Sequence, residues 1–299
     1  MISTSYVGRF APSPSGPLHF GSLIAALGSY FDARAHDGHW LVRMEDLDPP
    51  REMAGAADLI LRTLEAYQLH WDGQVVYQST RHQRYQEQIE LWIATGQAYF
   101  CQCTRKQIKA SGGFYDGMCR GKKLNNSEPH SVRLRMDHPV TQFFDEKHGE
   151  TTIPHALAEE DFIIKRRDGL YAYNLAVVID DIDQGITQIV RGADLIEPTG
   201  RQVSLYKTLK LPPVKYLHLP LAMDANGNKL SKQNHAQGIN ITSPKAELIS
   251  AMQFLRFDLP IDFADLTVEQ MVSWGVAHWH LTQLPDEINI TSPFSKPTS

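Results

Sequence analysis

Hydrophobic positions alternate over the opening residues of the chain and then recur at helical spacing, with a stretch rich in proline and glycine between them. The alternation covers residues 5–10, and the helical spacing covers residues 21–35. Pro12, Pro14 and Gly16 lie in the intervening stretch. Because alternation is typical of strands and helical spacing of amphipathic helices, this segment predicts a strand, a loop and a helix.

A second strand and a second helix are predicted directly afterwards. Residues 40–44 form an apolar run after the turn at Asp37-Gly38, and Pro49-Pro50 ends that run. Residues 54–67 again carry apolar positions at helical spacing. An order of strand, helix, strand and helix is typical of a parallel sheet with helices on its faces.

The same pattern returns after residue 165. Tyr173–Ile179 is a run of mostly apolar and β-branched residues, which predicts a strand buried on both faces of the sheet. A helix is expected over Thr199–Leu209, and the chain after residue 240 is expected to be helical.

The segment between these two regions has a different character. Gly112-Gly113, Gly117 and Asn125-Asn126 interrupt short alternating runs from about residue 99 onwards. We therefore expect an insertion that splits one α/β domain. The predicted organisation is a first half over residues 1–98, an insertion over 99–165, a second half over 166–240 and a small helical segment over 241–299.

Composition and charge limit the classes of protein that are possible. With 42% hydrophobic and 21% charged residues, 299 residues can bury a sizeable core. The N-terminus carries no apolar leader, and no uncharged apolar run reaches the roughly 18 residues of a membrane helix, so we expect a cytoplasmic protein without a membrane partner. The net charge of −5 argues against indiscriminate binding of nucleic acid.

The negative charge is concentrated near the C-terminus. Residues 241–299 contain three basic and seven acidic side chains, a net of −4, which leaves about −1 for residues 1–240. Three basic runs, at residues 105–109, 120–123 and 165–167, could therefore follow a phosphate backbone. Taken singly, each such run is more typical of a solvated surface.

The three cysteines lie close together in the predicted insertion. Cys101, Cys103 and Cys119 are odd in number and clustered, unlike the cysteines of a secreted disulfide framework. Thiolates are ligands that zinc prefers, and a structural zinc site takes four ligands. No histidine lies between Cys103 and Cys119, so the fourth ligand stays open, as does the alternative of three inert or redox-sensitive thiols.

The loop after the first predicted strand carries the candidate chemistry. It reads Arg-Phe-Ala-Pro-Ser-Pro-Ser-Gly-Pro-Leu-His-Phe-Gly-Ser-Leu over residues 9–23. Gly21 allows close approach of a backbone, the free N–H groups of the helix N-terminus favour an anion, and His19 could donate to a phosphate. The alternative is an ordinary turn in which Ser13 or Ser15 caps the helix.

This loop resembles a signature of the glutamyl-tRNA synthetases, P-x-P-[ST]-G-x-L-H-x-G, which is a variant of the class I HIGH motif. Residues 229–233, Lys-Leu-Ser-Lys-Gln, resemble the class I KMSKS loop. Further strings at residues 42–48, 173–176 and 189–194 are also similar to this family. The resemblance spans about residues 5–240.

The resemblance implies a fold and a reaction. The fold is α/β, with the Rossmann-type parallel sheet of class I synthetases, an inserted zinc-containing subdomain and a small helical C-terminal segment. In this family the carboxylate of an amino acid attacks the α-phosphorus of ATP, which is bound with magnesium, to give an aminoacyl-adenylate and pyrophosphate. The matched positions imply that His19 and Lys232 are catalytic through contacts with the phosphates, and that the ATP site comprises Pro12, Gly21, Ser22, Lys229, Ser231 and Lys232.

Glutamate is the amino acid that the resemblance implies. Its second carboxylate requires a cation, and arginine supplies a bidentate one, so Arg9 and Arg191 are the candidates. The charge of Glu45 suits the substrate ammonium, and Ser13 and Tyr173 complete the matched positions. As alternatives, Arg9 could lie on the surface, Glu45 and Asp46 could cap the next turn, and Tyr173 could simply pack.

For the cysteine cluster, the resemblance supplies the missing ligand. Tyr115, within Gly-Gly-Phe-Tyr-Asp-Gly at residues 112–117, stands where the family has an unusual phenolic fourth ligand. The zinc would be structural and would organise the insertion.

The acceptor of the activated glutamate is suggested by the end of the chain. Only 67 residues follow Lys232, fewer than the anticodon-binding domain of glutamyl-tRNA synthetases needs. Strings at residues 113–120, 196–199 and 232–236 resemble the glutamyl-queuosine tRNA(Asp) synthetase family, whose members activate glutamate without tRNA. The implied partners are L-glutamate, ATP and the anticodon stem-loop of tRNA(Asp) carrying queuosine, and we expect a monomer.

Three alternatives stay open at this point. The chain could be a truncated conventional glutamyl-tRNA synthetase, or an RNA-binding relative without catalytic activity. It could also be a nucleotidylyltransferase that acts on a small metabolite, although such enzymes often use HxGH loops and Ser22 stands here in place of the second histidine.

Overall fold

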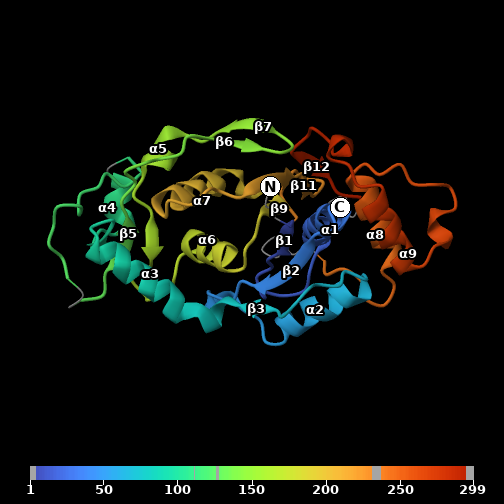
Figure 1. Ribbon diagram of the computed structural model, residues 1–299, viewed down its shortest axis with the longest axis horizontal. Coiled ribbons are helices and arrows are strands. Elements are labelled where there is room, and N and C mark those ends of the chain that lie inside the picture. Colours follow the sequence, from blue (N-terminus) through green and yellow to red (C-terminus); the bar gives the residue numbers. More distant parts are fainter. Residues whose placement is uncertain (1–4, 111, 126–127, 231–236, 294–299) are drawn as a thin grey trace.

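The computed structural model describes residues 5–110, 112–125, 128–230 and 237–293. Figure 1 shows an elongated molecule in which the chain around residues 105–125 lies at one end and the chain after residue 245 lies at the other. The central strands lie between these two ends. No described helix combines the length and the hydropathy that crossing a membrane requires.

The first half of the α/β domain follows the predicted order. β1 (Val7–Phe10), β2 (His39–Met44) and β3 (Val76–Tyr77) pair in parallel, in the order β1-β2-β3. The crossover between β1 and β2 is α1 (Phe20–Ala35), and α2 (Ala56–Ala66) and α3 (His82–Ala94) follow. The strands and helices predicted for residues 5–67 are therefore confirmed.

The α/β domain continues with a four-stranded sheet beside the first. Its order is β7-β6-β10-β9, formed by β6 (Gln142–Asp145), β7 (Gly149–Thr152), β9 (Gln188–Gly192) and β10 (Lys215–Leu219). β10 pairs in parallel with both β6 and β9. The backbone N–H of Thr187 donates to the carbonyl of Val7 at 2.9 Å, which joins the start of β9 to the start of β1.

The strand predicted over Tyr173–Ile179 is wrong, because these residues form the start of α6 (Tyr173–Asp183). The helix is buried on nearly every side, from Leu175 to Asp181. A helix that is covered all round carries no polar stripe, so its sequence shows no helical period and resembles a buried strand. The next predicted helix is confirmed as α7 (Ile196–Thr208).

The predicted insertion contains a sheet of its own. β4 (Ala98–Cys101), β5 (Ser131–Leu134) and β8 (Ile163–Lys165) form three antiparallel strands, accompanied by α4 (Arg105–Ala110) and α5 (His155–Glu159). The hairpin of β6 and β7, from the same part of the chain, pairs instead with β10 of the α/β domain. The domain boundaries themselves stay a prediction.

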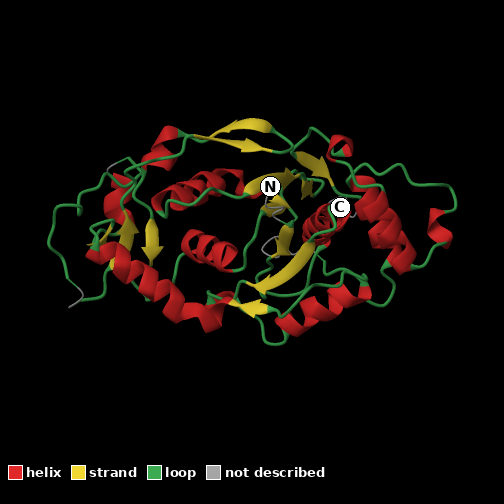
Figure 2. Ribbon diagram, viewed as in Figure 1, coloured by secondary structure: helices red, strands yellow, loops and turns green. Residues whose placement is uncertain are grey.

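The regular structure of the C-terminal segment is mainly helical, as predicted (Figure 2). α8 (Lys245–Phe254) and α9 (Val268–Ala277) pack against α1. The chain then ends its described part with β12 (Asn289–Thr291), which pairs in parallel with β11 (Leu221–Met223). A turn over residues 224–228 joins β11 to the start of the KMSKS-like segment, so the C-terminal strand supports the entry to that loop.

Candidate active site

A cavity of about 630 Å³ lies where the central parallel strands end. It is lined by residues at and just beyond the carboxyl ends of β1, β2, β9 and β10. This is the usual position of a ligand site in an open α/β sheet. Among the predicted site residues, the lining includes Arg9, Pro12, Ser13, His19, Gly21, Ser22, Glu45, Tyr173, Arg191 and Lys229. Ser231 and Lys232 lie outside the described residues.

His19 occupies the N-cap of α1. Its Nδ1 accepts a hydrogen bond from the backbone N–H of Ser22 at 3.2 Å. The expected alternative of a cap by Ser13 or Ser15 is therefore wrong. Because Nδ1 is the acceptor, the proton of the neutral ring is on Nε2, where it suits donation to an anion at the helix N-terminus.

Gly21 lets the two signature segments approach each other. A Cβ at this position would lie 3.2 Å from Cε1 of His19 and 3.5 Å from the carbonyl oxygen of Leu230. The first contact is tighter than ordinary van der Waals distance, so any side chain at residue 21 would press on the cap and the KMSKS-like segment.

The backbone on either side of the second loop is fixed to the site. On one side, the N–H of Leu230 donates to the carbonyl of Ala222 at 2.8 Å. On the other side, the N–H of Ile239 donates to the carbonyl of Leu18 at 2.9 Å. Lys229 contacts Asp194 through an Nζ–Oδ2 ion pair of 2.5 Å. The described chain on either side of residues 231–236 is thus fixed close to the HIGH-like loop.

A buried network of charges holds Arg9 and Glu45. One oxygen of Asp181 accepts from Arg9 Nε at 3.1 Å and from Arg43 Nη1 at 2.8 Å. Arg43 also reaches Glu45 Oε1 through Nη2 at 3.5 Å. Burial disfavours the charge of Asp181, but Arg43 and Arg9 outweigh it and hold the pKa of this carboxyl below its usual value.

For Glu45, burial outweighs the attraction of the neighbouring arginines. Burial raises the pKa of Glu45, and the opposing attraction of Arg43 and Arg9 does not cancel this effect. The carboxylate therefore gains from an additional cation in the cavity, such as an ammonium group.

Two of the alternatives considered for these residues are wrong. Arg9 is not a surface residue, because only 3% of it is exposed. Tyr173 does not simply pack in the core, since 37% of it is exposed and it lines the cavity at the first turn of α6.

Arg191 is buried at the end of β9 with one nitrogen unpaired. Its Nη2 donates to Thr199 Oγ1 at 2.6 Å, and its Nε donates to His218 Nε2 at 3.2 Å. Nη1 is buried and has no hydrogen-bond partner among the described residues. The site thus contains a buried cation with donor capacity left for a ligand.

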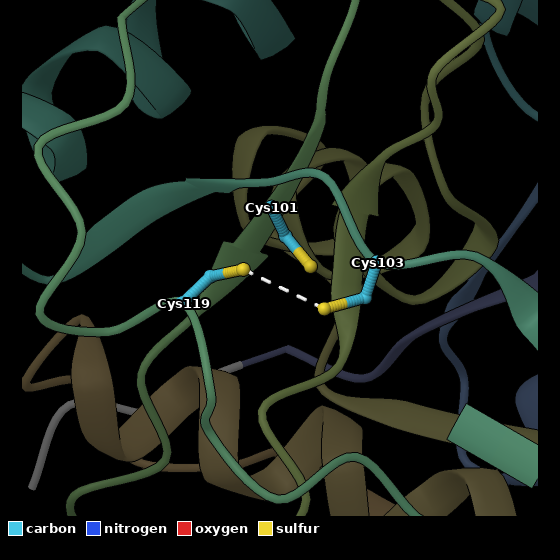
Figure 3. Close-up of side chains that lie close together, drawn as sticks. All are labelled: Cys101, Cys103 and Cys119. Carbon is cyan, nitrogen blue, oxygen red and sulfur yellow. Dashed lines mark hydrogen bonds between the residues drawn. The ribbon is translucent and has the colours of Figure 1, made fainter. Parts of the chain in front are cut away.

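The cysteines form a separate cluster in the insertion (Figure 3). The Sγ atoms of Cys101, Cys103 and Cys119 all lie within 4.8 Å of one another, and those of Cys103 and Cys119 are 3.5 Å apart. Two sulfurs on one tetrahedral zinc are about 3.8 Å apart, given Zn–S bonds of about 2.3 Å. Three sulfurs at this spacing fit that ion. The Tyr115 hydroxyl is beside them, accepting from the backbone N–H of Cys119 at 2.8 Å.

Comparison with known proteins identifies the family. Residues 6–257 match the family model described as tRNA synthetases class I (E and Q), catalytic domain. The glutamyl-Q tRNA(Asp) synthetase of Vibrio cholerae serotype O1 is 70% identical over 97% of this chain and 96% of its own. The chain belongs to the glutamyl-Q tRNA(Asp) synthetase family. It is therefore a ligase. The protein of the same name from Serratia proteamaculans is 56% identical over 99% of both chains.

Solved structures support the fold of this glutamyl-Q synthetase family member. A glutamate tRNA ligase from Elizabethkingia meningosepticum superposes with a TM-score of 0.78 at 22% identity, covering 96% of this chain and 67% of that one. The glutamate-tRNA synthetase of Elizabethkingia anophelis gives the same TM-score and identity. At this identity the likeness shows the class I synthetase fold alone.

Several residues of this family member's site were not found from the sequence. Arg43 and Asp181 hold Arg9 and Glu45, and Asp194 holds Lys229. The available signal was the pair of consecutive aspartates that ends the apolar run of α6, because buried carboxylates require a cationic partner. Because this segment was predicted to be a strand, the direction of these two side chains could not be predicted.

Proposed function

We propose that this chain activates L-glutamate with ATP, without tRNA, and transfers the glutamyl group to the queuosine base in the anticodon of tRNA(Asp). The observation that carries the proposal is one cavity that contains Glu45 and two buried arginines beside a helix N-terminus and a lysine-bearing loop. The relatives' printed name, glutamyl-Q tRNA(Asp) synthetase, supports the same substrates.

In this proposal, the charges of the cavity match those of glutamate. Glu45 takes the α-ammonium, and Arg9 and Arg191 are the cations available for the side-chain carboxylate. Arg191 has a donor left for the side-chain carboxylate, since Nη1 has no partner among the described residues. Glutamine lacks the negative charge that would offset the burial of this cation, so glutamate is favoured.

ATP would bind across the HIGH-like and KMSKS-like segments. His19 donates from Nε2, the backbone of Gly21 allows close approach, and Lys229 and Lys232 add positive charge near the phosphates. The magnesium that accompanies ATP belongs to the substrate. The glutamate α-carboxylate attacks the α-phosphorus, the bond to the bridging oxygen breaks, and pyrophosphate leaves with its electrons. No side chain acts as a nucleophile, so catalysis consists of positioning and charge stabilisation.

The RNA partner would meet the insertion. Residues 105–123 carry six basic side chains and one acidic one, a net of +5 in a chain of net −5. Within this segment, Phe114 is 44% exposed and offers a ring on which a base can stack. Because its proposed substrates include tRNA, we place the reaction in the cytoplasm. We also expect the protein to act as a monomer.

A structural zinc in the insertion is part of the proposal. Cys101, Cys103 and Cys119 would hold it, with Tyr115 as the fourth ligand. The ion would cross-link the basic segment, residues 105–123, to β4 through Cys119 and Cys101. It takes no part in the transfer of glutamate.

A transfer assay tests the acceptor. Radiolabelled glutamate and ATP are incubated with the protein and with tRNA(Asp) that carries or lacks queuosine. We expect label only on the queuosine-containing tRNA, and we expect it to survive removal of the terminal adenosine. Label on the terminal adenosine of tRNA(Glu) would instead support a truncated conventional synthetase. Absence of glutamyl transfer to any tRNA would contradict the proposed acceptor.

A further inference from the structure

We propose that Asp145 and His218 form a positioning relay, which fixes the guanidinium of Arg191 so that its Nη1 faces the substrate carboxylate. Neither residue lines the cavity, and neither is part of the HIGH-like or KMSKS-like segments. The inference rests on the proposed function, because it takes Arg191 as a ligand of glutamate.

The sheet places the three residues on neighbouring strands, with Asp145 in register with Tyr216, two residues before His218. β6, β10 and β9 are neighbouring parallel strands, and His218 is the register partner of Arg191. Side chains at paired positions of parallel strands project from the same face of the sheet. Asp145 and His218 are completely buried. A polar line therefore crosses the sheet from its interior towards the cavity.

Asp145 is held as a carboxylate. Its Oδ2 accepts from His218 Nδ1 at 2.7 Å, and its Oδ1 accepts from the backbone N–H groups of Lys147 and His148 at 3.0 and 2.9 Å. Burial disfavours its charge, but the hydrogen bond from His218 and those backbone groups hold the pKa of Asp145 below its usual value.

The carboxylate sets the tautomer of His218. Since Asp145 is an acceptor, the ring proton lies on Nδ1, and Nε2 carries the lone pair. Nε2 is then able to accept from Nε of Arg191, at 3.2 Å. Burial lowers the pKa of His218, which keeps the ring neutral. A neutral ring is required here, because the Nε2–H of an imidazolium would face the Nε–H of Arg191, and two donors cannot form a hydrogen bond.

The second fixed point of the guanidinium is Thr199. Its hydroxyl donates to the carbonyl of Leu195 at 2.7 Å and accepts from Nη2 of Arg191 at 2.6 Å. Two nitrogens of a planar fork are thereby fixed, and the plane of the guanidinium is defined. The orientation of Nη1 follows from these two contacts. The relay thus sets the geometry of glutamate selection without touching glutamate.

The test uses two substitutions that alter the relay with little change in volume. Asp145→Asn allows the amide to donate to Nδ1, which moves the ring proton to Nε2 and sets it against Arg191. His218→Leu removes the acceptor altogether. We expect the KM for glutamate in RNA-free ATP–pyrophosphate exchange to rise about 10- to 100-fold in both, a range typical for loss of an outer-shell partner. The KM for ATP should change less than twofold.

Leu217→Ala is the matched control. Leu217 precedes His218 on β10, and its side chain belongs to the core cluster around α1 on the opposite face. This variant should lower the melting temperature while leaving the KM for glutamate unchanged. His218→Gln retains an acceptor for Arg191 and should recover part of the affinity lost in His218→Leu.

The outcomes separate the relay from the proposed function. If the wild type shows no glutamate-dependent exchange, the proposed function fails. If the wild type exchanges and the relay variants keep the wild-type KM for glutamate, the relay is wrong. Nitrogen NMR of the wild-type histidines gives a readout independent of activity and of variant folding. We expect the Nδ1–H tautomer for His218, and an Nε2–H tautomer would overturn the relay.

Discussion

At the scale of single residues, the site depends on groups whose charge or proton is fixed by a buried neighbour. The cap at His19 places a proton on Nε2, and the network of Asp181 and Arg43 holds Arg9 and Glu45. Fixed donors of this kind cost no reorganisation when charge develops in the transition state. Three residues proposed to touch substrate, His19, Arg9 and Glu45, are thus each held by a partner behind them.

Glu45 leads to a prediction about pH. Burial raises the pKa of Glu45, so the carboxyl becomes protonated at a higher pH than an exposed glutamate would. Its protonated form cannot pair with the substrate ammonium. The KM for glutamate should therefore rise as the pH falls towards the pKa of Glu45. Glu45→Gln should raise that KM about 10- to 100-fold at neutral pH, as expected for loss of a charge-assisted hydrogen bond of about 1.5–3 kcal/mol.

The comparison of the two pH profiles is the decisive part of this measurement. The dependence over this acidic range should be much weaker in Glu45→Gln than in the wild type, because the variant has no carboxyl to titrate at this position. Equal profiles for the two proteins would show that a different group binds the ammonium.

Lys232 gives a second prediction at this scale. Its role comes from the KMSKS-like motif, and loss of one charged donor to the phosphates should lower kcat of glutamate activation by about 10²–10³ for Lys232→Ala. Pyrophosphate exchange measures this, with Lys207→Ala on α7 as a control that retains wild-type turnover. Near-wild-type turnover of Lys232→Ala would contradict the catalytic role assigned to the KMSKS-like loop.

At the scale of elements, the sequence predicted those whose hydrophobic pattern has a visible period. β1, α1, β2 and α2 each expose one face or are bounded by proline or glycine, and their positions were predicted within a few residues. α6 was mistaken for a strand because it is buried all round. The loop residues of the site were predicted from motifs, whereas their buried supports were not, since contacts between distant strands leave no local pattern.

The C-terminal helices lead to a prediction about stability. A Cβ on Gly275 of α9 would lie 2.7 Å from Cζ of Phe31, in the C-terminal half of α1. Gly275→Ala should therefore destabilise the fold by about 1–3 kcal/mol through overpacking. Gly121→Ala is the control, because nothing lies within 4 Å of the added methyl group there. Chemical denaturation compares the two, and equal stability would show that α9 is free to move away from α1.

At the scale of the whole molecule, the α/β domain lies between a basic insertion and an acidic C-terminal segment (Figure 1). The insertion contains the cysteine cluster and the exposed Phe114, while α8 and α9 brace α1 from the other side. In the proposed function, RNA contact belongs to one end and support of the catalytic loops to the other.

Zinc content tests that division of roles. Purified protein should contain one zinc per chain, and Cys103→Ser should lower this content and the melting temperature. Because the ion lies in the insertion, its loss should impair transfer to tRNA more than RNA-free glutamate activation. Elemental analysis with both assays measures this, and a stoichiometry well below one in the wild type would leave the cysteines as ordinary thiols.

The central claim is that this cavity activates glutamate by itself, and RNA-free ATP–pyrophosphate exchange across a panel of amino acids tests it most directly. We expect exchange that depends on glutamate and is at least about 100-fold weaker with glutamine, because glutamine would offer Arg191 no charged partner. Exchange that requires tRNA, or that occurs equally with glutamine, would contradict the account.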